Sequence, residues 1–488
     1  MKKRKMRQWL AMLCMAAAVT MLAGCSFGGF SAESLMRPPA ASGDGAGLQQ
    51  ALSENLGDQI TLRYPRSGEH RSAVVQANID GDAAQEAIVF YRPATENSGA
   101  RMAVLDMDED NKWQLVSAGE STVGEIDRVM FGDLDGDGAP DIVTGWSIYS
   151  GTSKLMMAHS YIGGELRSIP VMSDVQTEHD TQHAENMVIT ASADIYTEMA
   201  LADFDKDGRD EIMSVHLNTV DGNSTARFIE LRRDSYSNTS GLYIAHTAPL
   251  DGRMVKYIGV QAAQVSYENY AMVLDGYRAD GVYTTEVVRW DAKKQCLEAP
   301  FNDSGTNICT FVRSQNMVSQ DFNADGIMNF PTDSLVAGYT AADEAPLYLT
   351  TWHRFYGDSV QDEKTVLMCT DNGYYIQFSS KWQSEVSVRP EQQSDQPLDI
   401  MYFYRETDSG FTSEIMRIKV FTPDEWEQED AWEPLDILAD DEEAPRYMEL
   451  ISTDYYVYGV LISTDMGLDK GELTTTYEEV LEAFRLLP

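Results

Sequence analysis

Short apolar runs separated by polar turns dominate the chain from about residue 58 to about residue 370. Typical runs are AIVFY at 87–91 and DIVTGW at 141–146, which are rich in β-branched and aromatic residues. Runs of this length and composition predict β-strands, and no stretch between them has the apolar spacing of a helix. The polar turns join neighbouring strands into hairpins, at about four strands per ~55–70 residues. The pattern therefore predicts a mainly β region of repeated antiparallel units.

An acidic stretch recurs between these apolar runs. In FGDLDGDGAPDIV, at 131–143, aspartates stand at loop positions 1, 3, 5 and 9, and a glycine stands at position 6. Related loops start at residues 78, 203 and 321, and each follows one apolar run and leads into another. A single DxDxDG match is weak, whereas related copies in the same strand context predict an internal repeat.

The recurring carboxylates predict a cation site. Alternate carboxylates on a tight turn bring their oxygens to one point, and a hard cation with oxygen ligands, above all Ca²⁺, removes their repulsion. An EF-hand is excluded because the flanking segments are strands and position 12 is never glutamate. That position holds Val89, Thr144, Ser214 and Thr332. The sequence therefore predicts structural calcium sites, with plain Asp/Gly turns as the alternative.

One further copy of the repeat is expected between the third and fourth acidic loops, which lie about twice the usual distance apart. The stretch AAQVSYENYAMVLDGY at 262–277 aligns there with a loop of the same length. We interpret it as a repeat that kept its strands and lost its metal, with a chance match as the alternative. Its ligand positions hold Ala262, Gln264, Ser266 and Tyr270.

The acidic loops resemble FG-GAP/VCBS repeats, the calcium-bearing blades of integrin-α-like propellers, and Phe131-Gly132 matches the FG of that name. The resemblance covers residues 58–370. It implies a β-propeller of about five four-stranded blades, or six, closed by pairing of the strand near 59–64 with the last blade. It also implies structural Ca²⁺ bound through positions 1, 3, 5 and 9 and a backbone carbonyl at position 7. The implied ligands are Asp133, Asp135, Asp137, Ala139 and Asp141; Asp203, Asp205, Asp207, Arg209 and Glu211; Asp321, Asn323, Asp325, Ile327 and Asn329; and, in a first loop where Ala83 replaces the glycine, Asn78, Asp80, Asp82 and Glu86.

The N-terminus has the pattern of an export signal. Five of the first seven residues are basic, and an apolar segment from Trp9 to Ala23 follows. The segment ends in Leu-Ala-Gly-Cys, which resembles the lipobox of bacterial lipoproteins, with an ordinary secretory signal as the alternative. We expect residues 1–24 to be a signal peptide, Cys25 to carry the lipid, and residues 25–57 to form a flexible linker. The protein is then anchored to the bacterial cell membrane and faces outside the cytoplasm.

The sequence pattern changes near residue 370. Strands are expected at 400–405, 415–421, 447–451 and 455–462, with an acidic segment interpreted as a solvated loop, and a helix is expected over 474–487. Residues 371–488 therefore predict a separate, small α+β sandwich domain. This region more weakly resembles the PsbP/DcrB-like domains of small bacterial surface lipoproteins.

Charge and motifs narrow the function. The net charge of −41 argues against nucleic acid as a partner, because phosphate binding needs basic surface. No GxSxG elbow, Walker loop or dinucleotide fingerprint occurs, and His179 and His183 lie four residues apart without an HExxH frame. The chain is therefore expected to be a non-enzymatic binding or scaffolding protein whose protein or carbohydrate ligand the sequence does not identify.

Two observations leave alternatives open. Trp113, Trp146, Trp290 and Trp352 recur near the expected blade edges. They suit either the core or a carbohydrate platform, and a platform would favour a propeller-type carbohydrate-active enzyme acting on polysaccharide. Cys296 and Cys309 could close a short disulfide loop or remain free.

Overall fold

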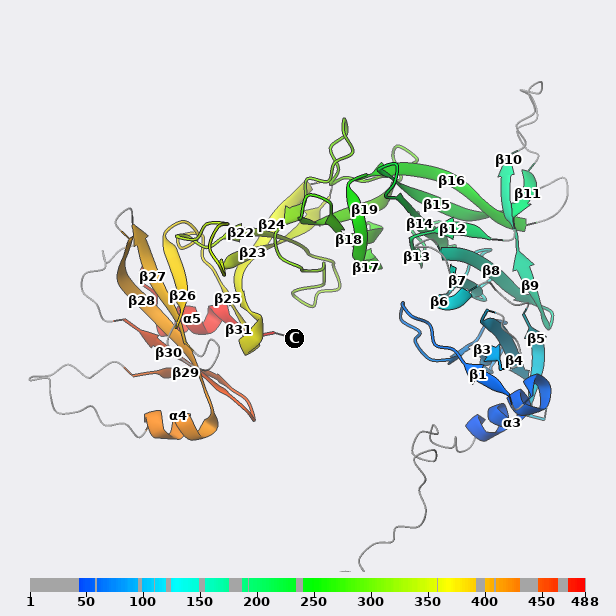
Figure 1. Ribbon diagram of the computed structural model, residues 1–488, viewed down its shortest axis with the longest axis horizontal. Coiled ribbons are helices and arrows are strands. Elements are labelled where there is room, and N and C mark those ends of the chain that lie inside the picture. The colour runs from blue at the N-terminus through cyan, green and yellow to red at the C-terminus, as the bar shows by residue number, and fades with distance from the viewer. Residues whose placement is uncertain are drawn as a thin grey trace, which may run out of the picture.

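The fold is taken from a computed structural model of the chain. Six sheets follow one another along an open arc, so the expectation of a mainly β protein is confirmed (Figure 1). The expected signal peptide, Cys25, and the pair His179 and His183 lie outside the described residues. Those residues are 44–57, 59–94, 99–108, 110–119, 124–148, 154–174, 187–191, 193–233, 240–357, 359–391, 400–407, 410–430, 446–463 and 473–487.

The first three sheets form one half of the arc. The first sheet has the order β1-β3-β4-β5, with β2 also paired to β3. The second has the order β12-β8-β7-β6 with β9 on β8, and the third has the order β11-β10-β16-β15-β14-β13. Strand β10 joins β16 in parallel, whereas the other pairings in these sheets are antiparallel. The strands are β1 (Ile60–Leu62), β2 (Val74–Ala77), β3 (Glu86–Pro93), β4 (Arg101–Met107), β5 (Trp113–Ala118), β6 (Gly124–Gly132), β7 (Asp141–Ile148), β8 (Lys154–Ile162), β9 (Glu165–Ile169), β10 (Val171–Asp174), β11 (Met187–Ala191), β12 (Asp194–Tyr196), β13 (Glu198–Ala202), β14 (Glu211–Asn218), β15 (Asn223–Arg233) and β16 (Ser240–Leu250).

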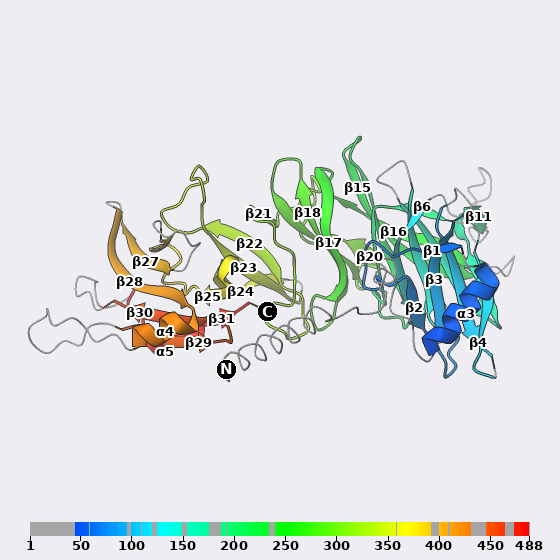
Figure 2. The same cartoon turned by 60° about the horizontal axis from the view of Figure 1, so that its bottom comes forward.

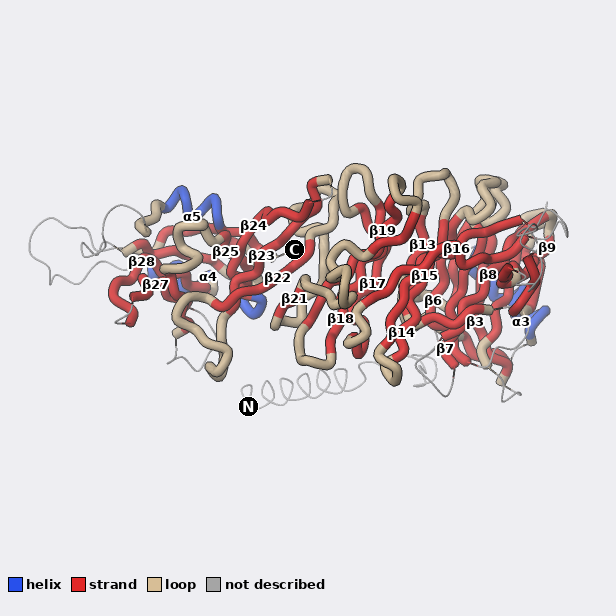
Figure 3. The backbone as a smooth tube through the Cα atoms, turned by 90° about the horizontal axis from the view of Figure 1, so that it is seen from above, coloured by secondary structure: helices blue, strands red, loops and turns tan. Residues whose placement is uncertain are grey.

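The other three sheets complete the arc. The fourth has the order β17-β18-β19-β20 with β21 on β19, the fifth β22-β23-β24-β25-β31, and the sixth β26-β27-β28-β30-β29. Figure 3 shows that helices lie at the two ends of the molecule. The elements are β17 (Met254–Gln264), β18 (Tyr270–Arg278), β19 (Tyr283–Asp291), β20 (Cys296–Glu298), β21 (Val312–Arg313), β22 (Phe330–Leu335), β23 (Tyr348–Tyr356), β24 (Ser359–Cys369), the 3₁₀ turn η1 (Thr370–Asn372), β25 (Tyr374–Gln377), β26 (Val386–Pro390), β27 (Ile400–Thr407), β28 (Gly410–Phe421), α4 (Pro423–Asp430), β29 (Met448–Ser452), β30 (Val457–Ile462), α5 (Tyr477–Ala483) and β31 (Phe484–Leu486).

Neighbouring sheets pack face to face, and each contact has its own apolar core (Figure 2). Along β7, Ile142 belongs to the core shared with the first sheet, and the next residue, Val143, belongs to the core shared with the third. Successive side chains of a strand point to opposite faces, so a strand buried on both faces must be apolar at every position. This is why the strands appear in the sequence as unbroken apolar runs.

A helix covers the outer face of the first sheet. Helix α3 (Asp44–Leu56) packs Leu48, Ala51 and Leu52 against residues of β3, β4 and β5 such as Val89. The expectation of a flexible linker up to residue 57 is therefore wrong for this segment. The first sheet of a stack has one face without a neighbouring sheet, and an amphipathic helix removes that face from water.

The arc is not closed in the way the sequence led us to expect. Strand β1 pairs with β3 of its own sheet, with Thr61 opposite Arg92, and not with a strand of the last sheet. The predicted closure through residues 59–64 is therefore wrong. In addition, α3 covers the face on which a closing sheet would have to pack.

The expected domain boundary at residue 370 falls inside a sheet. Strand β24 pairs with β25 across this position, and β25 pairs with β31 at the other end of the C-terminal region. A single apolar core joins the fifth sheet to the sixth. The expected strands of the C-terminal region form β27 to β30, but the expected terminal helix ends at Ala483 and continues as β31, and the acidic segment begins with helix α4. No helix among the described residues is long and apolar enough to cross a membrane.

Candidate metal centres

The four acidic loops occupy equivalent places in four sheets. Three of them join β2 to β3, β6 to β7, and β13 to β14, and the fourth immediately precedes β22. The residue pairs that close them are Ala77 with Glu86, Gly132 with Asp141, Ala202 with Glu211, and Gln320 with Asn329. Each closing pair therefore encloses eight residues, and position 9 is always the first residue of the returning segment.

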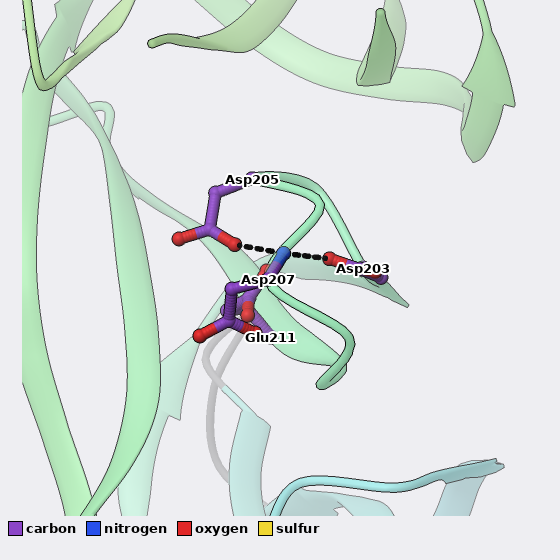
Figure 4. A group of neighbouring side chains, drawn as sticks. All are labelled: Asp203, Asp205, Asp207 and Glu211. Atoms are coloured by element: carbon purple, nitrogen blue, oxygen red, sulfur yellow. Dashed lines mark hydrogen bonds between the residues drawn. The ribbon is translucent and has the colours of Figure 1, made fainter. Parts of the chain in front are cut away.

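The third loop shows how the backbone holds the carboxylates (Figure 4). The two carboxylate oxygens of Asp203 accept hydrogen bonds from the backbone N–H of Asp207, at 3.1 Å, and of Gly208, at 3.2 Å. Asp205 also accepts from the N–H of Asp207, at 3.0 Å. Asp207 in turn accepts from the N–H of Arg209, at 2.9 Å. These bonds fix the turn and leave carboxylate oxygens directed toward a common point.

The geometry of the third loop fits a calcium ion. Ligand oxygens of Asp203, Asp205, Asp207 and Glu211 lie within 4.8 Å of one another. This spacing suits oxygens placed around an ion at the Ca–O distance of about 2.3–2.6 Å. Burial, followed by repulsion from Asp205, raises the pKa of Glu211 to about 8. Among the described residues no lysine or arginine forms an ion pair with these four carboxylates, so a bound cation would supply the missing positive charge.

The first loop carries an orphaned carboxylate oxygen. Glu86 is completely buried, and one of its oxygens accepts from the N–H of Ile79 at 2.7 Å, while the other, Oε1, has no hydrogen-bond partner. Burial raises the pKa of Glu86 to about 7. Asp80 and Asp82 lie beside it at ligand spacing. The side-chain oxygen of Asn78 accepts from the N–H of Gly81 at 2.7 Å. A cation would satisfy Glu86, so the loop that departs most from the repeat in sequence still fits a metal.

The second loop gathers three of its four predicted side-chain ligands. Ligand oxygens of Asp133, Asp135 and Asp137 lie within 4.8 Å of one another. Asp141 is not part of this group, because its oxygens accept from the N–H of Leu134, at 3.2 Å, and from the hydroxyl of Ser160. Burial raises the pKa of Asp141 to about 6.

The loops share a left-handed residue at position 4. Gly81, Gly136, Lys206 and Ala324 have φ values of 77°, 78°, 64° and 58°. Glycine adopts this conformation freely, whereas other residues are strained in it. At position 7, the N–H groups of Ala139, Arg209 and Ile327 donate to the position-5 aspartate.

The fourth loop keeps the backbone pattern of the third. Asp321 accepts from the N–H of Asp325, at 3.0 Å, and of Gly326, at 2.7 Å. The side-chain oxygen of Asn329 accepts from the N–H of Phe322 at 2.9 Å, as Glu211 does from Phe204 in the third loop.

The centre of the fourth loop nevertheless differs from the other three. The guanidinium of Arg354, on β23, contacts an oxygen of Asp325 at 2.5 Å. The amide nitrogens of Asn323 and Asn329 donate to Glu363, on β24, at 2.9 Å and 2.5 Å. Metal ligands must present oxygen lone pairs, so these residues do not fit the calcium site predicted for Asp321, Asn323, Asp325, Ile327 and Asn329.

The hairpin expected to be a metal-free repeat does join two antiparallel strands, β17 and β18. Gln264 pairs with Tyr270, which leaves only residues 265–269 in the loop, fewer than the eight of the acidic loops. The expectation of a loop of the same length is therefore wrong. Ala262 and Gln264 are strand residues, and Ser266 accepts from the N–H of Asn269 at 3.1 Å.

A cavity of about 500 Å³ lies where the edge strands β6, β13 and β17 come together on the inner side of the arc (Figure 1). Its wall is mixed, with Phe131, Leu201 and Tyr270 beside His70 and Arg71. The sequence did not indicate this cavity, because its lining comes from three sheets and from a loop before β2.

The tryptophans pack among other side chains, and the two cysteines do not form a disulfide. Trp113, Trp146 and Trp352 are buried, and Trp290 stacks on Phe228. The alternative of a carbohydrate platform is therefore not supported for these residues. Cys296 and Cys309 are both free thiols.

Comparisons with known proteins add no family. No protein-family description matches the chain, and no curated protein matches it. The crystal structure of AofleA from Arthrobotrys oligospora covers 74% of this chain and 84% of its own, with 9% identity and a TM-score of 0.27. A hypothetical protein from Leishmania major covers 66% and 94%, with 12% identity and a TM-score of 0.23. Similarity at this level carries no argument about fold or function.

Proposed function

We propose that this chain is a non-enzymatic binding or scaffolding protein, anchored to the bacterial membrane outside the cytoplasm, whose sheets are FG-GAP/VCBS-type blades stabilised by Ca²⁺. The calcium proposal rests mainly on the first loop. There a completely buried glutamate oxygen has no hydrogen-bond partner, and two more carboxylates lie next to it. The third loop supports it independently, since four carboxylates converge there and none of them forms an ion pair with a lysine or arginine among the described residues.

In this proposal the calcium has a structural role. Asp80, Asp82 and Glu86 would hold one ion, and the gathered carboxylates of the second and third loops would hold two more. In the first and third loops the ion would tie the turn to the first residue of the returning strand, Glu86 or Glu211. Outside the cytoplasm Ca²⁺ is available in the millimolar range, enough for sites with dissociation constants of ~10⁻⁴–10⁻³ M.

The proposed binding surface is the inner cavity. None of the acidic-loop carboxylates lines it, and its wall mixes apolar side chains with polar and charged ones that could orient a ligand. Among the described residues that line it, Glu69 is the only carboxylate. Glycoside hydrolysis generally needs two carboxylates, so binding of a protein or carbohydrate is favoured over its cleavage.

The membrane anchor rests on the sequence pattern ending at Cys25. The strongly negative chain, with a net charge of −41, supports a role in which neither nucleic acid nor an anionic lipid surface is the partner of the folded part. The lipid would hold the protein at the membrane, and the arc would present its inner side to a ligand.

Removal of calcium tests the proposal. Thermal unfolding of the protein without its signal peptide should show a lower melting temperature in EDTA, and added Ca²⁺ should restore it. When free Ca²⁺ is ~10 times the dissociation constant, each site should add about 1.4 kcal/mol to the free energy of unfolding. Mg²⁺ at the same concentration is the control, because it demands a smaller octahedral site and should restore less. Identical melting curves in EDTA and in Ca²⁺ would contradict the metal proposal.

A further inference from the structure

We propose that the guanidinium of Arg354 takes the place of the metal ion in the fourth acidic loop, so that this loop closes without calcium. The inference compares the fourth loop with the first three loops, which are proposed to bind calcium, and in that respect it rests on the proposed function. The contacts that support it all belong to the fourth loop. It means that an apparent calcium motif carries its own cation, supplied by a neighbouring strand.

The position of Arg354 is the first argument. Its side chain is only 7% exposed, and its Nη1 lies 2.5 Å from the Oδ2 of Asp325 and 3.7 Å from the Oε1 of Glu363. The other oxygen of Asp325 accepts from the N–H of Ile327 at 3.0 Å, as position 5 does in the other loops. The guanidinium therefore contacts the oxygen that position 5 leaves free for a metal in the first three loops.

The polarity of the surrounding amides is the second argument. Asn323 and Asn329 stand at positions where the third loop has acidic ligands, and both direct their N–H groups to Glu363. Glu363 thus brings a carboxylate to this loop from a different strand, where it accepts from the two amides and lies beside the positive charge of Arg354. The loop centre is thus a network in which Arg354 and the two amides face the carboxylates of Asp325 and Glu363.

The covering of Arg354 is the third argument. The ring of Tyr267 lies 5.5 Å from the guanidinium carbon, and the ring of Tyr356 lies 5.4 Å from it. Tyr267 stands at the tip of the shortened hairpin between β17 and β18. The hairpin without ligands therefore contacts the arginine of the neighbouring loop, and an entering ion would have to displace a guanidinium held by two carboxylates and two rings.

The inference divides the molecule by its response to calcium. The loops of the first, second and third sheets would depend on the ion, whereas the fifth sheet and the C-terminal region that shares its core would not. Calcium depletion should then loosen the N-terminal half of the arc and leave the C-terminal half folded.

Equilibrium dialysis with ⁴⁵Ca²⁺ tests this inference with matched variants at position 1. Asp203→Asn should lower the number of bound ions by one, and Asp321→Asn should leave it unchanged. A loss of one ion in Asp321→Asn would overturn the proposal. Conversely, the double variant Arg354→Gln with Asn329→Asp removes the competing cation and places a carboxylate at position 9. This variant should bind one more ion than the natural chain. Circular dichroism checks that it is folded.

A separate measurement keeps this inference distinct from the calcium proposal. If the natural chain binds no calcium at all, the proposed function fails, but Arg354→Gln should still lower the urea midpoint in EDTA because Asp325 and Glu363 lose their positive partner. If instead the midpoint of Arg354→Gln equals that of the natural chain in EDTA, the proposed role of Arg354 is wrong, whatever the other loops bind.

Discussion

The third and fourth acidic loops have the same backbone and opposite electrostatics. In both, the position-1 aspartate accepts from the N–H groups of positions 5 and 6, and position 4 is left-handed. In the third loop four carboxylates converge, and burial raises the pKa of Glu211 to about 8. In the fourth, burial acts on Asp325 as well, but the N–H of Ile327 and the charge of Arg354 outweigh it and lower the pKa. In our proposal, therefore, the same turn is held in one loop by a cation from solution and in the other by a cation from the chain.

A third way to hold a buried carboxylate is found in the fourth sheet. Glu286 is completely buried, and among the described residues its donors are all neutral: the N–H of Asp251 at 2.8 Å, the amide of Asn302 at 2.7 Å and, more weakly, the hydroxyl of Tyr257 at 3.4 Å. Burial raises the pKa of Glu286 from 4.5 to about 7. With neither a cation nor an arginine against it, Glu286 should respond to pH where Asp325 does not.

The largest expected effect is therefore that of Glu286→Gln. The folded-state pKa of Glu286 lies above its unfolded value, so its contribution to stability is complete below about pH 4.5 and is lost as the pH rises through about 7. The glutamine keeps the two close acceptor contacts and carries no charge. At pH 8 the variant should be more stable than the natural chain by roughly 2–3 kcal/mol, and at pH 4.5 the two should be equal. Urea unfolding at both pH values measures this, and a difference independent of pH would refute the explanation.

A smaller effect is expected for Glu211→Gln in the third loop. The glutamine can still accept from the N–H of Phe204, but it weakens the cation site. The calcium-dependent part of the unfolding free energy should fall by about 1.4 kcal/mol at ~10 times the dissociation constant, whereas stability in EDTA should be equal or higher.

The fourth loop provides the contrast for this variant. Asn329→Asp places a charge beside Glu363 and should destabilise the protein equally with and without calcium. If calcium rescued Asn329→Asp, the distinction between the two loops would be lost. Thermal melts of both variants in EDTA and in Ca²⁺ give the comparison directly.

The smallest expected effect is shared by the two loops. Lys206 and Ala324 have φ values of 64° and 58°, a conformation in which glycine is not strained. Lys206→Gly and Ala324→Gly should each stabilise the protein by about 0.5–1 kcal/mol, with the gain reduced by the greater freedom of glycine in the unfolded chain. Gly81 and Gly136 hold the same position in the first two loops. Equal shifts of the urea midpoint would show that the loops share their backbone, and a loss in both variants would contradict the strain argument.

Local features of the sites could be predicted from the sequence, and distant ones could not. The carboxylates of positions 1, 3 and 5 are brought together by the turn itself, so their spacing in the sequence was sufficient. Arg354 and Glu363 approach the fourth loop from other strands, and nothing near residue 321 indicates them. The inner cavity is missed for the same reason, since separate sheets contribute its walls.

The fold was predictable to a similar extent. Apolar runs revealed strands, because each strand is buried on both faces. Helix α3 had a visible signal in the spacing of Leu48, Ala51 and Leu52, but its small and polar neighbours suggested a linker. Phe484 and Leu487 fitted a helical pattern, yet pairing with β25 draws residues 484–486 into a sheet. Tertiary contacts override local preference at such positions.

The place of β31 has a consequence for the order in which the molecule is assembled. Strand β25 is synthesised before the whole of the sixth sheet, but its outer edge is paired only when residues 484–486 arrive. Until then the backbone of Tyr374–Gln377 is an open edge of the kind that recruits foreign strands. A protease that cut after Ala483 and removed β31 would reopen that edge, so the protection of the fifth sheet from aggregation depends on a segment made after the whole of the sixth sheet.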